Sequence, residues 1–228
     1  MATRRATSPI SSPISGPKVP GAAAFLPVTH SLKVLADAVQ SCKGCELYRH
    51  ATQAVFGETI AASKKPRMMM VGEQPGDRED REGHPFVGPA GKLLDRCLEE
   101  AGIERGEVYV TNAVKHFKWE PRGKLRIHKK PSAGEIFACR PWLEAEVEVV
   151  KPELIVCLGA TAVQSLLGPR FRVSQSHGKV LNAEGRPPVL ATVHPSSILR
   201  AISEEDRHRQ TVEFIEDLRN AEAFLQKH

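Results

Sequence analysis

Residues 68–76 carry the sequence MMMVGEQPG, an apolar run that stops at a glycine-containing turn. An apolar side chain at nearly every position predicts a strand that is covered on both faces, because a strand with one solvent-exposed face would alternate apolar and polar residues. Three later runs share this character, at 108–114, 154–158 and 189–193. Residues 68–73 are therefore expected to form one of four strands in a buried sheet.

Helical patterns separate and follow these runs, at about 90–101, 132–150, 160–167 and 204–226. In the first of them, Leu93, Leu94 and Leu98 fall on one face of a helix. Strands that alternate with helices form parallel sheets with helices on both sides. The chain is therefore predicted to adopt an α/β fold, a three-layer α/β/α sandwich with a central, mostly parallel four-stranded sheet. Ligands of such sheets bind at the carboxyl ends of the strands.

Length and composition predict one domain behind a polar tail. The chain has 228 residues and is 41% hydrophobic, which is enough for a sizeable core. Residues 1–30 contain five prolines among Ser, Thr, Ala and Arg, and no acidic residue. We expect this Pro/Ser-rich tail to be disordered and residues 31–228 to form a single domain. An organelle transit peptide has a similar composition, but the prolines oppose the amphipathic helix that it needs.

Charge and cysteine content narrow the class of protein. The net charge of +5 fits a polyanionic partner. The sequence contains no run of 18 apolar residues, so it predicts no membrane-spanning helix. Five cysteines are an odd number and too few for a disulfide scaffold. A reducing compartment and a metal site are the better interpretation. We therefore expect a cytoplasmic protein.

Four of the cysteines are candidate metal ligands. Cys42 and Cys45 form a C-x2-C pair, whereas Cys139 and Cys157 stand far apart in the sequence. A zinc ribbon would repeat the pair, so the spacing suits a [4Fe–4S] cluster at least as well. The alternative is that Cys139 and Cys157 are simply buried apolar residues. Cys97 shares a helix face with leucines and is assigned to the core.

Candidate chemical groups stand where three of the predicted strands end. Glu73 follows the first strand, Asn112 ends the second and His194 follows the last. An asparagine amide can accept from N3–H and donate to O4 of uracil, a pattern that cytosine reverses. Histidine at this edge could donate to an oxyanion. Each residue also has an ordinary interpretation as a turn or strand-ending side chain.

Two further segments resemble parts of a nucleic-acid site. Phe86 in the sequence FVGPAG (86–91) could stack on a planar base or fill the core. Residues 115–130 contain seven Lys or Arg against one acid, with His116, Phe117, Trp119 and His128 among them. Basic residues interleaved with aromatics suit single-stranded nucleic acid, although a solvated basic loop has the same composition.

Taken in order from Cys42 to Arg200, these motifs resemble the uracil-DNA glycosylase superfamily, in particular its iron–sulfur branch. Two features resemble the UdgX subfamily, whose members attach covalently to DNA: Gln74 within 72–76, and Arg-Ile-His at 126–128. The subfamily pattern has a second basic residue where this chain has Leu125. That departure bears on phosphate contacts of the loop and not on the histidine.

The resemblance implies excision of uracil from single-stranded DNA, after which His128 becomes bonded to C1′ of the deoxyribose. Phe86 would stack on uracil, His194 would stabilise charge on O2, and Glu73 would face the sugar. Gln74 and Arg126 would position Glu73, the loop and a phosphate, with Asp77 and Asp80 in support. The implied site residues are the catalytic Glu73, His128 and His194, the substrate-binding Gly72, Gln74, Asp77, Phe86, Asn112 and Arg126, and the metal ligands Cys42, Cys45, Cys139 and Cys157.

The expected partners are uracil-containing single-stranded DNA and free uracil as product, with the protein a monomer. Two alternatives remain open from the sequence. One is an ordinary hydrolytic uracil-DNA glycosylase, in which an activated water attacks C1′ and His128 is a bystander. The other is a non-catalytic single-strand-binding module with a structural metal.

Overall fold

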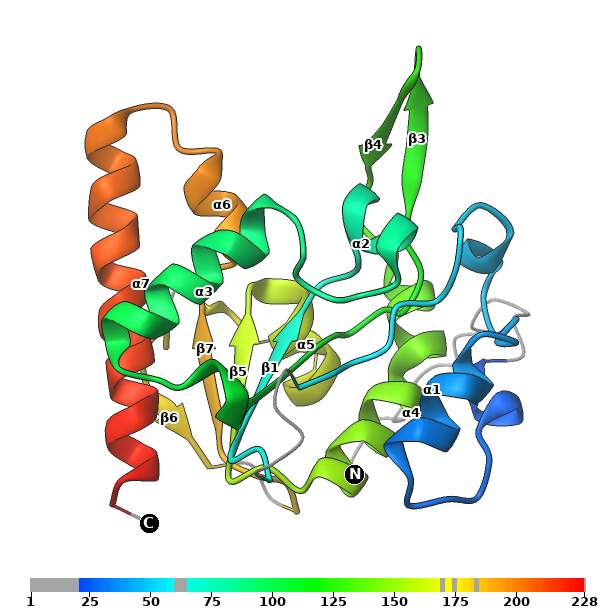
Figure 1. The fold of residues 1–228 in the computed structure, drawn as a ribbon, viewed down its shortest axis with the longest axis horizontal. Helices are drawn as coiled ribbons and strands as arrows, with labels where there is room; N and C mark the ends of the chain where they lie inside the picture. The colour runs from blue at the N-terminus through cyan, green and yellow to red at the C-terminus, as the bar shows by residue number, and fades with distance from the viewer. Residues whose placement is uncertain (1–20, 60–64, 169–170, 174–175, 183–184, 228) are drawn as a thin grey trace, which may run out of the picture.

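The computed structural model describes residues 21–59, 65–168, 171–173, 176–182 and 185–227 (Figure 1). At its centre is a five-stranded sheet with the order β2-β1-β5-β7-β6. The strands are β1 (Met68–Gly72), β2 (Val108–Asn112), β5 (Leu154–Leu158), β6 (Val180–Leu181) and β7 (Val189–Thr192). The predicted parallel pairing of the four long strands is confirmed, and β6 adds a short antiparallel edge strand.

Successive residues of each strand supply two different cores, because side chains alternate across a sheet. Met68 and Met70 of β1 pack into one apolar cluster, and Met69 and Val71 pack into another. Both faces are therefore buried, which explains why β1, β2 and β5 are apolar at nearly every position.

The first cluster is covered by α3 (Pro89–Ala101), α6 (Pro195–Leu199) and α7 (Glu204–Leu225). The second is covered by α4 (Ala133–Val150) and α5 (Ala160–Leu167). These two helical layers confirm the predicted α/β/α sandwich. Helix α4 begins at a capping box between Ser132 and Glu135, and α3 ends at Gly102, whose positive φ of 76° suits glycine.

A third apolar cluster joins the beginning of the described chain to α4. It contains Leu35 and Val39 of α1 (Leu32–Val39), together with Trp142 of α4. Ala22, in a short 3-10 helix at Ala22–Phe25, is fully buried in the same cluster. Residues 1–20 of the predicted tail lie outside the described residues. The predicted boundary at residue 30 is too late, because the segment around Ala22 already packs on the domain.

Sequence patterns did not predict the hairpin of β3 (Trp119–Arg122) and β4 (Leu125–His128). It follows β2, stands beside α2 (Asp77–Glu82) and projects from the sheet's carboxyl end (Figure 1). The basic segment 115–130 therefore has a defined structure. No helix within the described ranges is both long and apolar enough to cross a bilayer.

Candidate active site and cysteine centre

Gly72, Phe86 and Asn112 meet at the carboxyl end of the two neighbouring strands β1 and β2. Gly72 and Asn112 are partners in the register of these strands. A Cβ atom on Gly72 would lie 2.3 Å from Asn112 Oδ1 and 2.8 Å from Phe86 Cζ. The absence of a side chain at Gly72 therefore lets the amide and the ring stand together over the strand end.

The backbone of Phe86 is held in a conformation that bulky residues rarely adopt. Its φ is +58°, in the left-handed region. A Cβ atom on Gly91 would lie 1.6 Å from the Phe86 carbonyl oxygen, so only glycine allows this approach of α3. Glu79 accepts a hydrogen bond from the Gly88 amide at 2.8 Å, which fixes the same turn. Strained residues of this kind concentrate at binding sites.

His194 presents its ring to the same place from the end of β7. Its Nδ1 accepts a hydrogen bond from the amide of Ser196 at 3.1 Å and faces the hydroxyl of Ser196 at 2.8 Å. Because Nδ1 is an acceptor, the proton of the neutral ring lies on Nε2. Burial lowers the pKa of His194 to about 4, with Arg200 and His128 adding to the effect. The ring stacks against Phe86 with centroids 6.1 Å apart.

Glu73 and His128 form the second half of the site. His128 Nε2 lies 3.4 Å from Glu73 Oε1, and half of the His128 side-chain surface is exposed. Burial of the ring lowers the pKa of His128, which the carboxylate of Glu73 partly opposes. The hydroxyl of Thr161 donates to Glu73 Oε2 at 2.5 Å. The motif analysis missed Thr161, although it stands two residues after Gly159, at the expected carboxyl edge of β5.

Gln74 holds the base of the hairpin. Its Nε2 donates to the carbonyls of Lys118 and Lys129, each at 3.1 Å, and its Oε1 accepts from the Lys118 amide at 3.1 Å. Gln74 is 7% exposed. The side chain of Gln74 therefore links Lys118 to Lys129 at the base of the hairpin, and these hydrogen bonds use both its amide nitrogen and its amide oxygen.

Arg126, to which the resemblance assigns the positioning of Glu73, the loop and a phosphate, is held by two carboxylates. Its guanidinium donates to Asp77 at 2.5 Å and to Asp80 at 2.6 Å, and it stacks on the rings of Phe117 and Trp119. Thr52 and Asp80 are themselves hydrogen-bonded. Arg126 thus fastens β4 to α2 and carries His128 two residues further along the strand. Asp77 contacts Arg126 and supports the loop.

Other cations of the segment 115–130 are also buried or bound in ion pairs. Lys115 is fully buried, so it cannot meet a phosphate. Lys118 pairs with Glu135, and Lys129 pairs with Glu120. Within the described ranges, the exposed cations of this segment without an ion pair are Arg122, Lys124 and Lys130.

Three of the four candidate metal ligands come together. Cys42, Cys45 and Cys139 are buried in the third apolar cluster. The indole Nε1–H of Trp142 donates to Cys42 Sγ, and the Lys115 amide donates to Cys139 Sγ, both at 3.2 Å. Burial raises the pKa of Cys45 and raises that of Cys139 to about 12. N–H donors aimed at buried sulfurs are the surroundings that an iron–sulfur cluster needs.

Cys157 does not join them. It lies on β5 between Val71 and Ala191 and belongs to the second apolar cluster. The prediction of a four-thiolate set that includes Cys157 is therefore not supported by the packing. No three His, Cys, Asp or Glu side chains in the described ranges converge tightly enough to hold a single metal ion.

His116 is a buried group that the motif analysis left without a role. It is 5% exposed, and burial lowers its pKa to about 4, so the ring is neutral. It directly follows Lys115, the residue whose amide contacts Cys139. A neutral imidazole at this position has the chemistry of a metal ligand.

Comparison with known proteins decides the family. The family model described as the uracil DNA glycosylase superfamily matches residues 60–219. This chain belongs to the uracil DNA glycosylase superfamily. The superfamily predicted from the motifs is therefore correct, and so is the class of enzyme, a hydrolase of N-glycosyl bonds.

Among the relatives of this superfamily member, the type-4 uracil-DNA glycosylase of Thermotoga maritima is 35% identical over 197 residues, or 86% of this chain and 95% of that protein. The type-4 enzyme of Sulfurisphaera tokodaii is 38% identical over 77% of this chain and 81% of its own length. The type-5 uracil-DNA glycosylase of Pyrobaculum aerophilum is 33% identical over 67% and 72%. These names favour the hydrolytic alternative over covalent attachment.

Proposed function

We propose that this chain is a uracil-DNA glycosylase that excises uracil from single-stranded DNA. The observation that carries the proposal is the meeting of Phe86, Asn112 and His194 at one edge of the sheet, with Glu73 beside them. These groups supply a stacking surface, an amide and a neutral donor, which are the contacts that a flipped pyrimidine needs.

Each contact matches one part of uracil. The ring of Phe86 stacks on the base, while the amide of Asn112 accepts from N3–H and donates to O4. The Nε2–H of His194 donates to O2, where negative charge develops as the bond from N1 to C1′ breaks. A fixed donor of this kind typically contributes about 3 kcal/mol to transition-state stabilisation. Cytosine presents the reverse pattern to Asn112 and is excluded.

Glu73 acts on the sugar. Its carboxylate, fixed by Thr161, faces the positive charge of the oxocarbenium-like deoxyribose. In the hydrolytic course, Glu73 also accepts a proton from the water that attacks C1′. The type-4 names of the relatives support this course.

His128 offers a second course, the covalent one implied by the UdgX resemblance. The supporting observation is its ring nitrogen 3.4 Å from Glu73, where the attacking water would otherwise stand. In the neutral ring with its proton on Nδ1, Nε2 carries a free electron pair. That pair forms the bond to C1′ as the pair of the C1′–N1 bond leaves with uracil. The alkylated ring is then positively charged, and it loses its Nδ1 proton, which the uracil anion takes up.

One experiment separates these courses and tests the function. A uracil-containing single-stranded oligonucleotide is incubated with the protein, and both released uracil and SDS-stable protein–DNA bands are measured. Uracil release without a band establishes hydrolysis, and uracil release with a band establishes attachment through C1′. DNA binding without uracil release would overturn the proposal in favour of a single-strand-binding module.

The cysteine centre is proposed to hold a [4Fe–4S] cluster that ties the first described segment to α4. Cys42, Cys45 and Cys139 would be three of its ligands, and His116 is the candidate for the fourth. The support is the burial of these groups and the two N–H donors aimed at sulfur. The cluster supplies a structural cross-link, and no chemical step at the base depends on it.

A further inference from the structure

Lys115 and Glu146 form an ion pair whose side chains are both 0% exposed. Lys115 stands three residues beyond the end of β2, and Glu146 belongs to α4 on the second face of the sheet. The ammonium donates to Glu146 Oε2 at 2.5 Å. Such a pair is expensive to bury, and replacement by apolar residues of similar volume is often neutral or stabilising. Stability alone therefore does not explain why the chain places it here.

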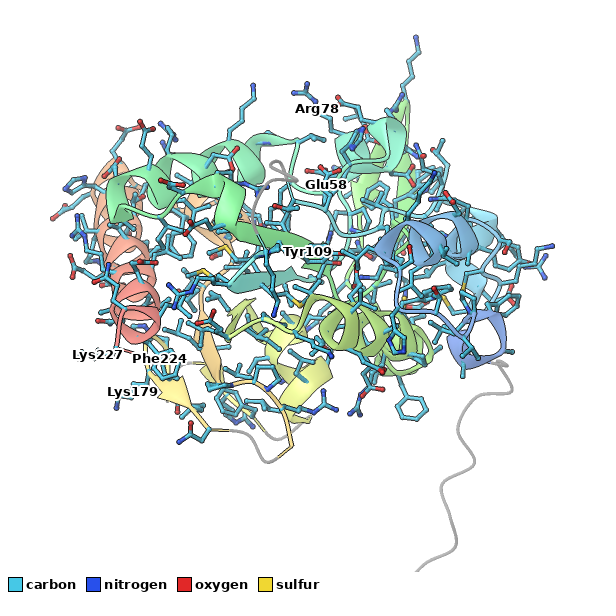
Figure 2. All side chains as sticks on the ribbon, turned by 60° about the horizontal axis from the view of Figure 1, so that its bottom comes forward. Glu58, Arg78, Tyr109, Lys179, Phe224 and Lys227 are labelled. Carbon is cyan, nitrogen blue, oxygen red and sulfur yellow. The ribbon has the colours of Figure 1, made fainter. Side chains whose placement is uncertain are left out.

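Every polar group of the pair is satisfied. The ammonium of Lys115 also donates to Thr111 Oγ1 at 2.7 Å and to the Asn112 carbonyl at 2.8 Å, which uses its three donors. Glu146 Oε1 accepts from the Gly57 amide, the Tyr109 hydroxyl and the Thr111 hydroxyl. Tyr109 lies near the centre of the molecule in Figure 2. The network is rigid, because no member can turn without losing a bond.

One bond of this network acts on the base-reading residue. The peptide between Asn112 and Ala113 is held at both ends: Lys115 donates to its carbonyl at 2.8 Å, and its amide donates to the Gly72 carbonyl at 2.9 Å. The strand ladder provides the second contact, but β2 ends at Asn112 and provides nothing equivalent for the carbonyl. Lys115 therefore fixes the peptide plane from which the Asn112 side chain departs.

We propose that the Lys115–Glu146 pair is a positioning device that fixes Asn112 for the recognition of uracil. This inference rests on the proposed function. An amide discriminates uracil from cytosine only if its oxygen and nitrogen meet the correct base atoms. Lys115 fixes the orientation of the Asn112 amide through its hydrogen bond to the Asn112 carbonyl, and the ion pair with Glu146 holds Lys115 in place. Neither side chain touches the base, so both are positioning residues.

The test is the double variant Lys115→Met with Glu146→Gln, which removes both charges together and leaves no unpaired buried ion. The matched control is Tyr109→Phe. This change removes a hydrogen bond to the Glu146 carboxylate but keeps the hydrogen bond from Lys115 to the Asn112 carbonyl. Three quantities are measured for each protein: thermal unfolding, uracil excision from a single-stranded oligonucleotide, and the inhibition constant of free uracil.

We expect the folded double variant to bind free uracil about tenfold more weakly, with a matching loss in excision, while Tyr109→Phe behaves as the parent. Unchanged uracil inhibition in the folded double variant would overturn the inference, as would an equal loss in Tyr109→Phe. If the double variant does not fold, Glu146→Gln alone decides: a loss no greater than that of Tyr109→Phe overturns the inference. A parent that releases no uracil would instead overturn the proposed function.

Discussion

His194 and His128 have the same side chain but different hydrogen-bond partners, so the two imidazoles can take different roles. Burial lowers the pKa of both rings, but Ser196 fixes the tautomer of His194, whereas the half-exposed His128 faces a carboxylate. In the proposed function, the first ring acts as a donor and the second as a base or nucleophile. Sequence alone placed both residues near the site, because strand ends and the family motif are visible there. It could not show Thr161, whose contact with Glu73 depends on how β1 and β5 lie side by side.

The replacement His128→Ser tests the covalent course at the level of one residue. Serine lacks the nucleophilic nitrogen, so the variant should form no SDS-stable band. Serine is also smaller, so water can enter the space and attack C1′ with help from Glu73, and uracil should still be released. Gel and uracil assays on the same samples measure both outcomes. His208→Ser, at an exposed position on α7, is the control. A band that persists in His128→Ser would assign the bond to another residue.

The lowered pKa of His194 predicts how stability depends on pH. The folded protein holds the pKa at about 4, below the ordinary value of 6.5 in the unfolded chain. As the pH falls from 6.5 toward 4, the unfolded chain takes up a proton that the folded protein refuses, so the contribution of neutral His194 is lost. Between pH 7 and pH 5, His194→Gln should lose about 4–7 °C less in melting temperature than the parent does.

The control for this measurement is His208→Gln, which changes an exposed histidine on α7. Its melting temperature should fall between pH 7 and pH 5 as much as that of the parent. An identical fall in His194→Gln would show that His194 is not held neutral by the fold.

At the scale of elements, the sheet was predictable and the hairpin was not. The four long strands are buried on both faces, and this leaves a continuous apolar signal in the sequence. The hairpin has no buried apolar face: β3 contains Pro121, Leu125 and Ile127 of β4 are exposed, and Arg126 is held by carboxylates from α2. Its structure depends on partners nearly 50 positions away in sequence, which no local pattern reveals.

If Arg126 fastens the hairpin, Arg126→Met should loosen it while leaving the sheet intact. The variant loses two charged hydrogen bonds, each of which typically contributes about 1.5–3 kcal/mol. Amide hydrogens of β3 and β4 should therefore exchange at least about tenfold faster, and uracil excision should fall because the hairpin loses its place beside the site. Hydrogen exchange read by mass spectrometry measures the first effect.

Lys124→Met is the matched control, because Lys124 stands in the turn of the same hairpin and has no ion pair in the part of the chain described. Its hairpin should exchange as the parent does. Unchanged exchange in Arg126→Met would show that the strands hold themselves and that the contact with α2 is incidental.

Over the whole molecule, the unpaired cations of the basic segment lie at one end. The three unpaired cations Arg122, Lys124 and Lys130 lie on or beside the projecting hairpin, whereas Lys179 and Lys227 lie near β6 and the C-terminus at the opposite end (Figures 1 and 2). Net charge of +5 gave only a general expectation of a polyanionic partner. The structure distinguishes exposed cations from those that Glu146, Glu135 and Glu120 neutralise.

Affinity for a single-stranded oligonucleotide should therefore fall with salt. Changing Arg122, Lys124 and Lys130 to Gln should make the slope of log affinity against log salt shallower by about 0.7 for each phosphate that the protein no longer neutralises. Changing Lys179 and Lys227 to Gln, as the control, should leave the slope as it is. Fluorescence anisotropy over a salt series measures this. An unchanged slope in the hairpin variant would exclude the hairpin as the DNA-binding element.

The cysteine centre joins parts of the chain that are far apart in sequence, so it is tested on the whole molecule. Cys42 and Cys45 precede β1, whereas Cys139 lies on α4, and a cluster between them would fasten the first described segment to the sheet. Cys139→Ser should therefore lose iron and the absorbance near about 400 nm, and should melt at a lower temperature. Cys157→Ser should keep both iron and colour, because Cys157 faces the other core. The same iron analysis on His116→Ala tests the fourth ligand: retained iron would exclude His116. Loss of iron from Cys157→Ser would instead restore the ligand set that spacing alone suggested, and would mean that β5 meets the cluster despite its place in the sheet.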